Sequence, residues 1–283
     1  MKIEKMALMD REKLLEYLGP YEKFCILLYS EITRNSPSVY IVKGNFGEIH
    51  GVFSWWKGSS IHHCLPEVYG KNRDEMERAF TEFFQEMSLQ FLFSIVGEKA
   101  GTNLLEKVLL NAFDKKPAYR IHNKLMENGR FDSKKNLLGA NRQLIVSSAK
   151  PEEVEKLYPL QLEYEKEEVT IPDHQLDEDA CYAKLENYVE AGAVYTGKIN
   201  GVIICKATVT ARAKNFALLG GVYTVPKYRK HGLAKTLVNT VSEALLKEQI
   251  RLTLFVKTTN MPAIKLYEDC GFKAVCDWEI LYY

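Results

Sequence analysis

Along the first half of the chain, stretches with apolar residues at helical spacing alternate with stretches typical of strands. Residues 73–87 carry apolar side chains with a helical period, at Met76, Ala79, Phe80, Phe83, Phe84 and Met87. Further helices are predicted at 10–18, 20–31 and 102–113. Strands are predicted at 38–44, 48–56, 59–65, 91–96 and 119–127, with a turn at 45–47. The first half is therefore expected to combine helices with antiparallel strands.

The second half repeats this order after a polar stretch, "NGRFDSKKNLLGANR". Helices are predicted at 151–168, 177–192, from Gly232 onward and at 261–270. We expect Pro159 to kink or split the first of these helices. Strands are predicted at 142–149, 193–209, 216–225, 252–257 and 275–283. The segment 193–209 is expected to be a hairpin that turns at Asn200–Gly201.

The repeated order predicts two domains of the α+β class. We place the first domain at residues 1–130, a linker at 131–140 and the second domain at 141–283, since 283 residues are enough for two domains. Each domain is expected to hold a twisted, mixed, mostly antiparallel sheet flanked by helices.

Composition and charge narrow the class of protein. Hydrophobic residues make up 46% and charged residues 27% of the chain, as in soluble globular proteins. A net charge of +1 argues against a nucleic-acid binder or a membrane-surface protein. The charged N-terminal stretch predicts no signal peptide, and the six cysteines form no CxxC pair, so we expect reduced thiols in a cytoplasmic protein. We expect no metal, because the adjacent His62 and His63 have no partner ligands in the sequence.

One long segment carries basic residues and no acidic ones. No aspartate or glutamate occurs from Ala191 to Ser242. The same window, called the acid-free window below, holds eight basic residues: Lys198, Lys206, Arg212, Lys214, Lys227, Arg229, Lys230 and Lys235. An apolar sheet core explains few charges of either sign, but it does not explain this imbalance. The segregation therefore predicts a site for an anionic ligand.

The glycine at the start of the predicted helix points to the same ligand chemistry. In "YRKHGLAKTL", Gly232 precedes an apolar helical stripe that begins at Leu233. The first backbone N–H groups of a helix lack internal acceptors and face outward with the positive end of the helix dipole. Such an end binds phosphate, and glycine allows close approach of the ligand to the backbone.

Two segments together indicate a family. The stretch "VYTVPKYRKHGLA" and the downstream "NMPAIKLYEDCGF" resemble the acetyl-CoA-binding motif and the following helix motif of the GNAT N-acetyltransferase superfamily. The resemblance is strongest over about residues 190–275, and the order of elements extends it to roughly 140–283. It implies that acetyl-CoA, or another acyl-CoA, is the co-substrate.

The resemblance also implies roles for particular residues. The loop that binds the pyrophosphate corresponds to Arg229, Lys230, His231, Gly232, Leu233 and Ala234, with Lys235 close by. The strand that pairs with the pantetheine arm corresponds to Val222, Tyr223 and Thr224. Asn260 matches the asparagine beside the cofactor, and Tyr267 matches the tyrosine that acts as general acid toward the departing thiolate. The other interpretation of Tyr267 is a half-buried aromatic residue of an amphipathic helix.

The general base is not given by the resemblance. Many members of the superfamily carry a glutamate on the strand before the loop, but "FALLGGVYTV" has none. The candidates lie in "LEYEKEEV", a region that borders the acceptor site in the superfamily: Glu163, Glu165, Glu167 and Glu168. They are candidates either for the base or for a rim that binds an amine. Such acidic runs are also typical of solvated helix faces.

The resemblance implies an N-acyltransferase that moves acetyl from acetyl-CoA to a primary amine by direct attack in a ternary complex. The acceptor stays open among small-molecule and peptide amines. The alternative is a non-catalytic acyl-CoA-binding regulatory protein. The first half has Gly70 but no R-x-x-G-x-A loop, and Glu67, Asp74 and Glu75 surround the corresponding helix start. We therefore expect a degenerate GNAT-like domain without a cofactor site at 1–130.

Overall fold

The computed structural model describes residues 1–55, 60–87, 89, 92–129, 143–172 and 174–283. The chain divides into two compact units, one made of Met1–Leu125 with Val275–Tyr283 and the other of Met126–Ala274. The linker predicted at 131–140 lies outside the described residues. The predicted second domain extends too far, because Val275–Tyr283 belong to the first unit.

The first unit contains seven strands and four helices among the described residues, with two of the strands crossing the unit boundary. Its strands are β1 (Lys2–Lys5), β2 (Val39–Lys43), β3 (Ile49–Trp55), β4 (Ser60–Cys64), β5 (Ser94–Glu98), β6 (Tyr119–Asn128) and β12 (Phe272–Tyr282). Its helices are α1 (Arg11–Leu18), α2 (Ile26–Thr33), α3 (Arg73–Glu86) and α4 (Lys99–Phe113). The strand order is β1-β2-β3-β4-β5-β12-β6. Strand β12 pairs with β5 antiparallel, Trp278 opposite Glu98, which explains why the C-terminal residues belong here.

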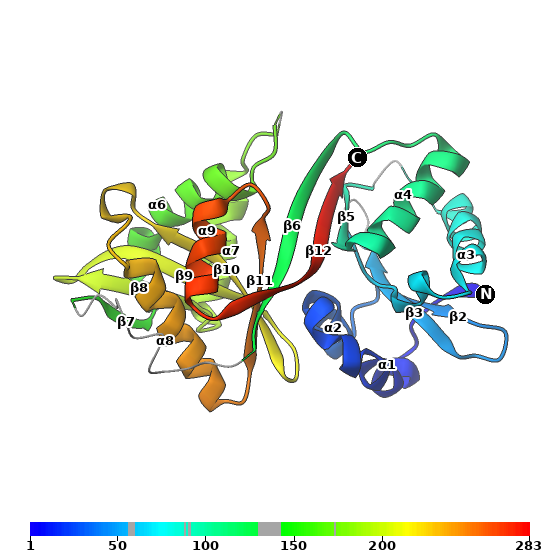
Figure 1. Cartoon of the computed structure of the whole chain (residues 1–283), viewed down its shortest axis with the longest axis horizontal. Helices are drawn as coiled ribbons and strands as arrows, with labels where there is room; N and C mark the ends of the chain where they lie inside the picture. Colours follow the sequence, from blue (N-terminus) through cyan, green and yellow to red (C-terminus); the bar gives the residue numbers. More distant parts are fainter. Residues whose placement is uncertain (56–59, 88, 90–91, 130–142, 173) are drawn as a thin grey trace. The chain divides into compact units, whose positions relative to one another are not determined.

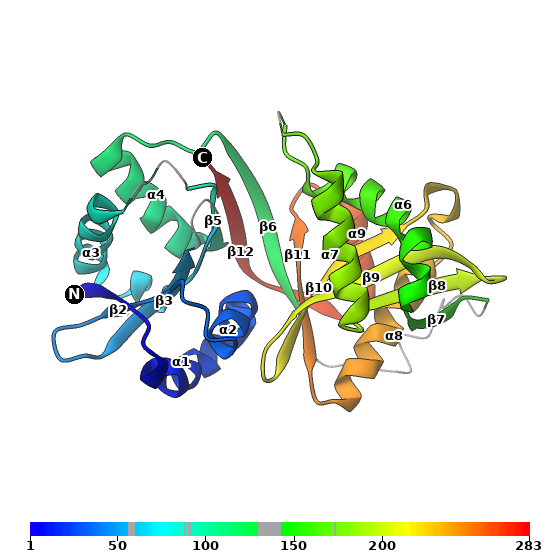
Figure 2. The ribbon, with the colours of Figure 1, turned by 180° about the vertical axis from the view of Figure 1, so that it is seen from behind.

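Alternate residues of the strands in the first unit face two separate helical layers. Val42 and Phe53 pack in a cluster with residues of α3 and α4. Their neighbours Ile41 and Val52 pack instead with α1 and α2. Figures 1 and 2 show these helix pairs on opposite faces of the sheet. Because successive side chains face opposite helical layers and both sets are buried, these strands are nearly continuous apolar runs in the sequence.

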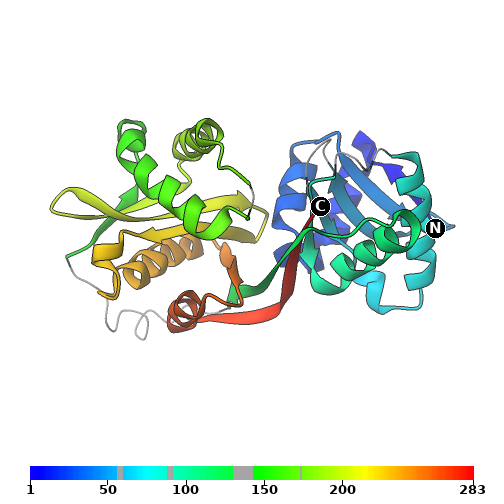
Figure 3. The ribbon, with the colours of Figure 1, turned by 90° about the horizontal axis from the view of Figure 1, so that it is seen from above.

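The second unit contains the predicted motifs. Its strands are β7 (Ile145–Ser148), β8 (Val194–Ile199), β9 (Val202–Arg212), β10 (Phe216–Thr224) and β11 (Arg251–Lys257), in the order β11-β10-β9-β8-β7. Its helices are α6 (Val154–Tyr164), α7 (Glu178–Glu190), α8 (Leu233–Lys247) and α9 (Met261–Asp269). In Figure 3, α6 and α7 (green) cover one face of this sheet, and α8 and α9 (orange to red) cover the other. The α+β prediction of helices flanking a mixed sheet is confirmed.

Two irregularities in β10 open the sheet of the second unit. The parallel pairing of β10 with β11 covers only Phe216–Leu219, opposite Arg251–Leu254, although both strands continue further. The antiparallel pairing of β10 with β9 shifts register between Gly220 and Tyr223. The edge of β10 from Gly220 onward is therefore not paired with β11. An unpaired strand edge can bind an extended ligand through its backbone.

Helix α6 is not split at Pro159, so this part of the prediction was wrong. The helix runs through that residue and is followed by a π-helical turn, Glu165–Val169. Such turns widen a helix by one residue and rotate the side chains that follow. In the described part of the chain, no helix is both long enough and apolar enough to cross a membrane.

Candidate active site

All but one of the predicted cofactor residues line a single groove in the second unit. The groove has a volume of about 550 Å³ and is bordered by β10, the start of α8 and α9. His231 is the exception; its ring lies 3.3 Å from the carbonyl oxygen of Tyr228. The lining residues are Glu167, Glu168, Val222, Tyr223, Thr224, Tyr228, Arg229, Lys230, Gly232, Leu233, Ala234, Lys235, Asn260, Pro262, Ala263, Leu266 and Tyr267.

The loop before α8 has a backbone suited to an anion. Gly232 is the N-cap of α8 and has a left-handed conformation, with φ of 74°. Lys230 is left-handed too, with φ of 65°. No side chain caps the first turn of α8, so its N–H groups are not taken by an N-cap oxygen. Left-handed residues next to a helix start turn successive N–H groups toward one point, which favours phosphate.

The Arg229 side chain links this loop to two neighbouring elements. Its Nε donates to the Thr224 carbonyl oxygen at 2.9 Å, and a terminal nitrogen lies 2.9 and 3.0 Å from the two carboxylate oxygens of Glu167. The guanidinium also lies 5.2 Å from the centre of the Tyr223 ring. Arg229 therefore connects the loop to β10 and to the π-helical turn.

Basic residues of the acid-free window find partners outside it. Besides Arg229, Arg212 forms an ion pair with Glu248, and Lys198 forms one with Glu153. The window is therefore less positive in the structure than its composition suggests. The backbone of the loop remains the feature that fits an anion best.

The α9 side of the groove carries an asparagine and a tyrosine. Asn260 is the N-cap of α9: its Oδ1 accepts a hydrogen bond from the Ala263 N–H at 3.1 Å, and its Nδ2 donates to Glu168 at 2.9 Å. Tyr267 is buried in the groove wall against Phe272. Burial raises the pKa of Tyr267 well above its usual range. The phenol therefore stays protonated at neutral pH.

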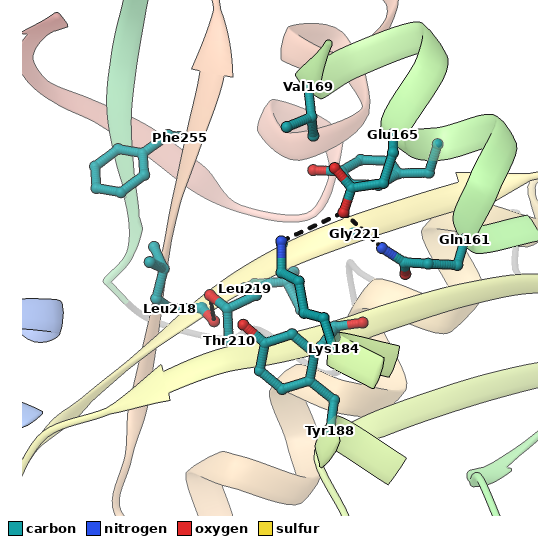
Figure 4. A pocket seen from close by; sticks show the side chains of 13 residues that line it. Gln161, Glu165, Val169, Lys184, Tyr188, Thr210, Leu218, Leu219, Gly221 and Phe255 are labelled. Atoms are coloured by element: carbon teal, nitrogen blue, oxygen red, sulfur yellow. Dashed lines mark hydrogen bonds and ion pairs between the residues drawn. The ribbon is translucent and has the colours of Figure 1, made fainter. Parts of the chain in front are cut away.

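A second, smaller pocket of about 200 Å³ holds a buried carboxylate. Glu165 is 4% exposed, and its Oε1 accepts hydrogen bonds from Gln161 at 2.7 Å and from Lys184 at 3.3 Å (Figure 4). The pocket is lined by Gln161, Tyr164, Glu165, Val169, Lys184, Tyr188, Thr208, Thr210, Leu218, Leu219, Gly220, Gly221 and Phe255. Gly221 lines the smaller pocket, and the next residue, Val222, lines the groove. The two cavities therefore adjoin along β10.

Comparison with known proteins identifies the second unit. The model of the GNAT acetyltransferase family matches residues 154–272, from the start of α6 to the start of β12. Residues 154–272 are called the GNAT domain below, after the family whose model they match. A search of the curated proteins found no significant match to the sequence.

Solved structures resemble the whole chain in fold. A Drosophila protein has 14% identity and a TM-score of 0.66, over 99% of this chain and 98% of that one. A GNAT-family acetyltransferase from Colwellia psychrerythraea has 12% identity and a TM-score of 0.59, over 100% of both chains. A tandem GNAT protein from the clavulanic acid biosynthesis pathway, determined without AcCoA, has 12% identity and a TM-score of 0.58, over 99% of this chain and 97% of that one. The predicted relation to tandem GNAT proteins is thereby confirmed at the level of the fold.

The predicted acidic candidates separate into three positions in the GNAT domain. Glu163 lies on the exposed side of α6, forms an ion pair with Lys166 at 3.2 Å and lines neither cavity. Glu167 and Glu168 line the groove, where they bond to Arg229 and Asn260. Glu165 alone among the four lines the smaller pocket.

Sequence reasoning missed most of the smaller pocket. Gln161 and Lys184 were not identified, although Gln161 stands four residues before Glu165, a spacing that places two side chains on one helix face. Lys206 was noted only as part of the acid-free window, but it is fully buried, with 0% exposure. A lysine inside the apolar strand "VIICKATV" was the available signal.

In the first unit, His62 and His63 are structural residues. Nε2 of His63 lies 2.9 Å from the Thr102 hydroxyl, and burial lowers the pKa of His63 to about 3 and that of His62 to about 4. Both rings are therefore neutral at neutral pH. No group of three or more His, Cys, Asp or Glu residues in the described ranges is arranged to hold a metal ion.

Proposed function

We propose that the GNAT domain is an acyl-CoA-dependent N-acyltransferase that transfers acetyl from acetyl-CoA to a primary amine by direct attack in a ternary complex. One observation carries the proposal: a single groove brings together the left-handed Gly232 at the start of α8, the unpaired edge of β10, and Tyr267. In this one cavity, the start of α8 can bind phosphate, the edge of β10 can bind the extended pantetheine group, and Tyr267 can donate a proton.

The cofactor is assigned along this groove. The N–H groups at Lys230 to Lys235 bind the pyrophosphate, since the left-handed turns at Lys230 and Gly232 direct them outward. The edge of β10 at Val222, Tyr223 and Thr224 offers its backbone to the pantetheine arm. Asn260 shapes the opposite wall because it caps α9 and holds Glu168. This order points the thioester toward the junction with the smaller pocket.

Tyr267 is the proposed general acid. The departing thiolate needs a proton, and a phenol, whose ordinary pKa is about 10, carries one at neutral pH. Tyr267 lines the groove from α9, so its hydroxyl belongs to the cofactor side of the reacting centre.

The amine acceptor is assigned to the smaller pocket, with Glu165 as the proposed base. A carboxylate in a half-buried pocket attracts an ammonium ion and can take its proton, so that the neutral amine attacks the thioester carbonyl carbon. Among the described residues, the hydrogen bonds to Glu165 are made to Oε1 by Gln161 and Lys184. Glu167 and Glu168 are less suited to this role because they line the cofactor groove and not the smaller pocket.

Acyl-CoA binding and turnover test the proposal. We expect acetyl-CoA to raise the melting temperature, and an amine panel to include acceptors that release free CoA. Gly232→Ala should weaken acetyl-CoA binding at least about tenfold, because a Cβ then stands between the phosphate and the backbone.

Gly192→Ala is the matched control. Gly192 also has positive φ, 64°, in the second unit and has no heavy atom within 4 Å of a built Cβ. Both variants carry the strain of a left-handed alanine, about 1–2 kcal/mol, but only Gly232→Ala should lose affinity. Equal losses would refute the groove as the cofactor site. Binding without turnover of any amine would instead identify a non-catalytic acyl-CoA-binding protein.

A further inference from the structure

A β-bulge lies where the groove meets the smaller pocket. In the pairing of β9 with β10, Thr208 is opposite Gly220 and Lys206 is opposite Tyr223. Gly221 and Val222 therefore face the single residue Ala207, which defines a bulge on β10. Gly221 adopts φ of 56° there. A Cβ at Gly221 would lie 3.0 Å from the Thr208 hydroxyl oxygen and 3.1 Å from Nζ of Lys206, so the space is tightly filled.

Lys206 holds the carbonyl group of this bulge. Its Nζ donates a hydrogen bond to the Gly221 carbonyl oxygen at 3.0 Å and lies 5.1 Å from the centre of the Tyr164 ring. The side chain is 0% exposed. Leaving a buried amine without hydrogen bonds is costly, which makes the contact with Gly221 persistent.

The charged surroundings of Lys206 come from the helices that cover this face. Glu165 of the π-helical turn and Cys181 of α7 favour the ammonium form, whereas Lys184 of α7 disfavours it. None of the ion pairs found among the described residues includes Lys206. Its bond to the backbone does not depend on charge, because both the ammonium and the neutral amine can donate a hydrogen bond.

We infer that Lys206 is a positioning residue: by holding the Gly221 carbonyl, it aims the Val222 N–H at the thioester carbonyl oxygen of the acyl-CoA. This rests on the proposed function. Because a trans peptide is planar, its C=O and N–H point in opposite directions, so fixing the Gly221 oxygen on Lys206 fixes the Val222 N–H away from Lys206. Val222 lines the cofactor groove and is opposite no residue of β9 in the ladder.

The Gly221 N–H lies near the Tyr164 phenol, where it partly offsets the effect of burial on the pKa of Tyr164. The Gly221 carbonyl is the group of this bulge that a side chain holds by a hydrogen bond. The next N–H along β10, that of Val222, is the one that we assign to polarise the thioester as negative charge develops on its oxygen. A donor fixed in advance stabilises the transition state without reorganisation.

The test is Lys206→Met, which keeps most of the length of the side chain and removes the donor. We expect kcat to fall about 10- to 100-fold, as when an oxyanion donor is weakened, with KM for acetyl-CoA within about twofold. In acetyl-CoA labelled at the thioester carbonyl carbon, the infrared stretch should lie lower in the wild-type complex than in free acetyl-CoA. It should return toward the free value in Lys206→Met. A purely structural role would not move this band.

A conservative variant and a control complete the experiment. Lys206→Arg retains a donor and should recover part of kcat and of the band shift. Lys198→Met removes a lysine of β8 that pairs with Glu153 and lines neither cavity, and it should leave both unchanged. If Lys206→Met does not fold, Gly221→Ala takes its place, since its Cβ enters the contact between Lys206 and Gly221; it should show the same loss of kcat and of band shift.

The outcomes separate this inference from the proposed function. If the wild type binds no acyl-CoA, the proposed function fails and the inference fails with it. If the wild type acylates an amine and Lys206→Met keeps its kcat and its carbonyl band, the inference alone is overturned. The inference is also overturned if Lys206→Met loses the acidic limb of the kcat–pH profile, because Lys206 is then the proton acceptor.

Discussion

Replacing Lys206 with methionine should stabilise the second unit in a pH-dependent manner. Lys206 is 0% exposed, and burial lowers its pKa from 10.5 to about 7. Methionine has a similar length and no charge, so the variant removes the cost of burying an amine and keeps the space filled. The loss of one hydrogen bond to Gly221 opposes this gain by about 1 kcal/mol.

The sign and size of the effect follow from the two pKa values. Between about pH 7 and about pH 10.5 the unfolded chain binds one more proton than the folded chain, so the free energy of unfolding of the wild type rises with pH, by about 1.4 kcal/mol per unit. Below about pH 7 the whole penalty is present, up to roughly 5 kcal/mol. Replacements of buried ions by apolar residues stabilise proteins by about 1–4 kcal/mol. We expect a gain in this range near pH 6, and a gain that shrinks steadily toward pH 10.

Urea unfolding from about pH 6 to about pH 10 measures this difference, with two probes. All three tryptophans, Trp55, Trp56 and Trp278, lie outside residues 126–274, so their fluorescence follows the first unit. Far-UV circular dichroism follows both units, and a transition without a fluorescence change belongs to the second unit. A gain that is the same at every pH would contradict the reasoning. So would a Lys206→Met variant less stable than the wild type near pH 6.

Three further variants test the candidate site. Tyr267→Phe should lower kcat about 10²- to 10⁴-fold with little change in KM for acetyl-CoA, measured as release of free CoA; an unchanged kcat would exclude the general acid. Glu165→Gln should lower kcat about 100-fold with the same amine acceptor, whereas an unchanged kcat would place the base elsewhere. Glu167→Gln leaves Arg229 without its carboxylate partner, so acetyl-CoA should bind several-fold tighter at low ionic strength and equally at high salt. Weaker binding, measured by calorimetry, would show that the ion pair shapes the loop.

The cofactor half of the site could be predicted because it is local in sequence. The left-handed turn at Gly232, the first turn of α8 and the end of β10 lie within about fifteen consecutive residues. A glycine before an amphipathic stripe was therefore enough to locate the end of the groove that we propose as the phosphate site, and the α9 segment added Asn260 and Tyr267. The sequence could not show that Arg229 bonds to Glu167, because the two residues are sixty-two positions apart in the chain.

The acceptor half could not be predicted, because its residues come from separate elements. Gln161, Glu165 and Lys184 meet only after α6 and α7 pack together on one face of the sheet. The π-helical turn Glu165–Val169 also changes which acidic side chains face inward. A regular helical wheel therefore does not separate Glu165 from Glu163, Glu167 and Glu168.

The limits of the fold prediction have similar causes. The apolar period of α3 was strong, and the helix predicted at 73–87 is observed at Arg73–Glu86. Strand β1 was not predicted, because the segment "KIEK" is too short and too polar to show an alternation of apolar and polar residues. The pattern of β12 indicated a strand but not its neighbour, since burial of a side chain does not specify against which sheet it is buried.

The position of the proposed base on the helical layer follows from the buried lysine. A carboxylate on β10 beside the bulge would lie next to Lys206 and form an ion pair with it. That pair would draw Nζ from the Gly221 carbonyl and so release the bulge. In a strand that carries no acidic residue, Lys206 keeps the bulge in place. The base that we propose therefore lies off the sheet, at Glu165 in the π-helical turn that follows α6.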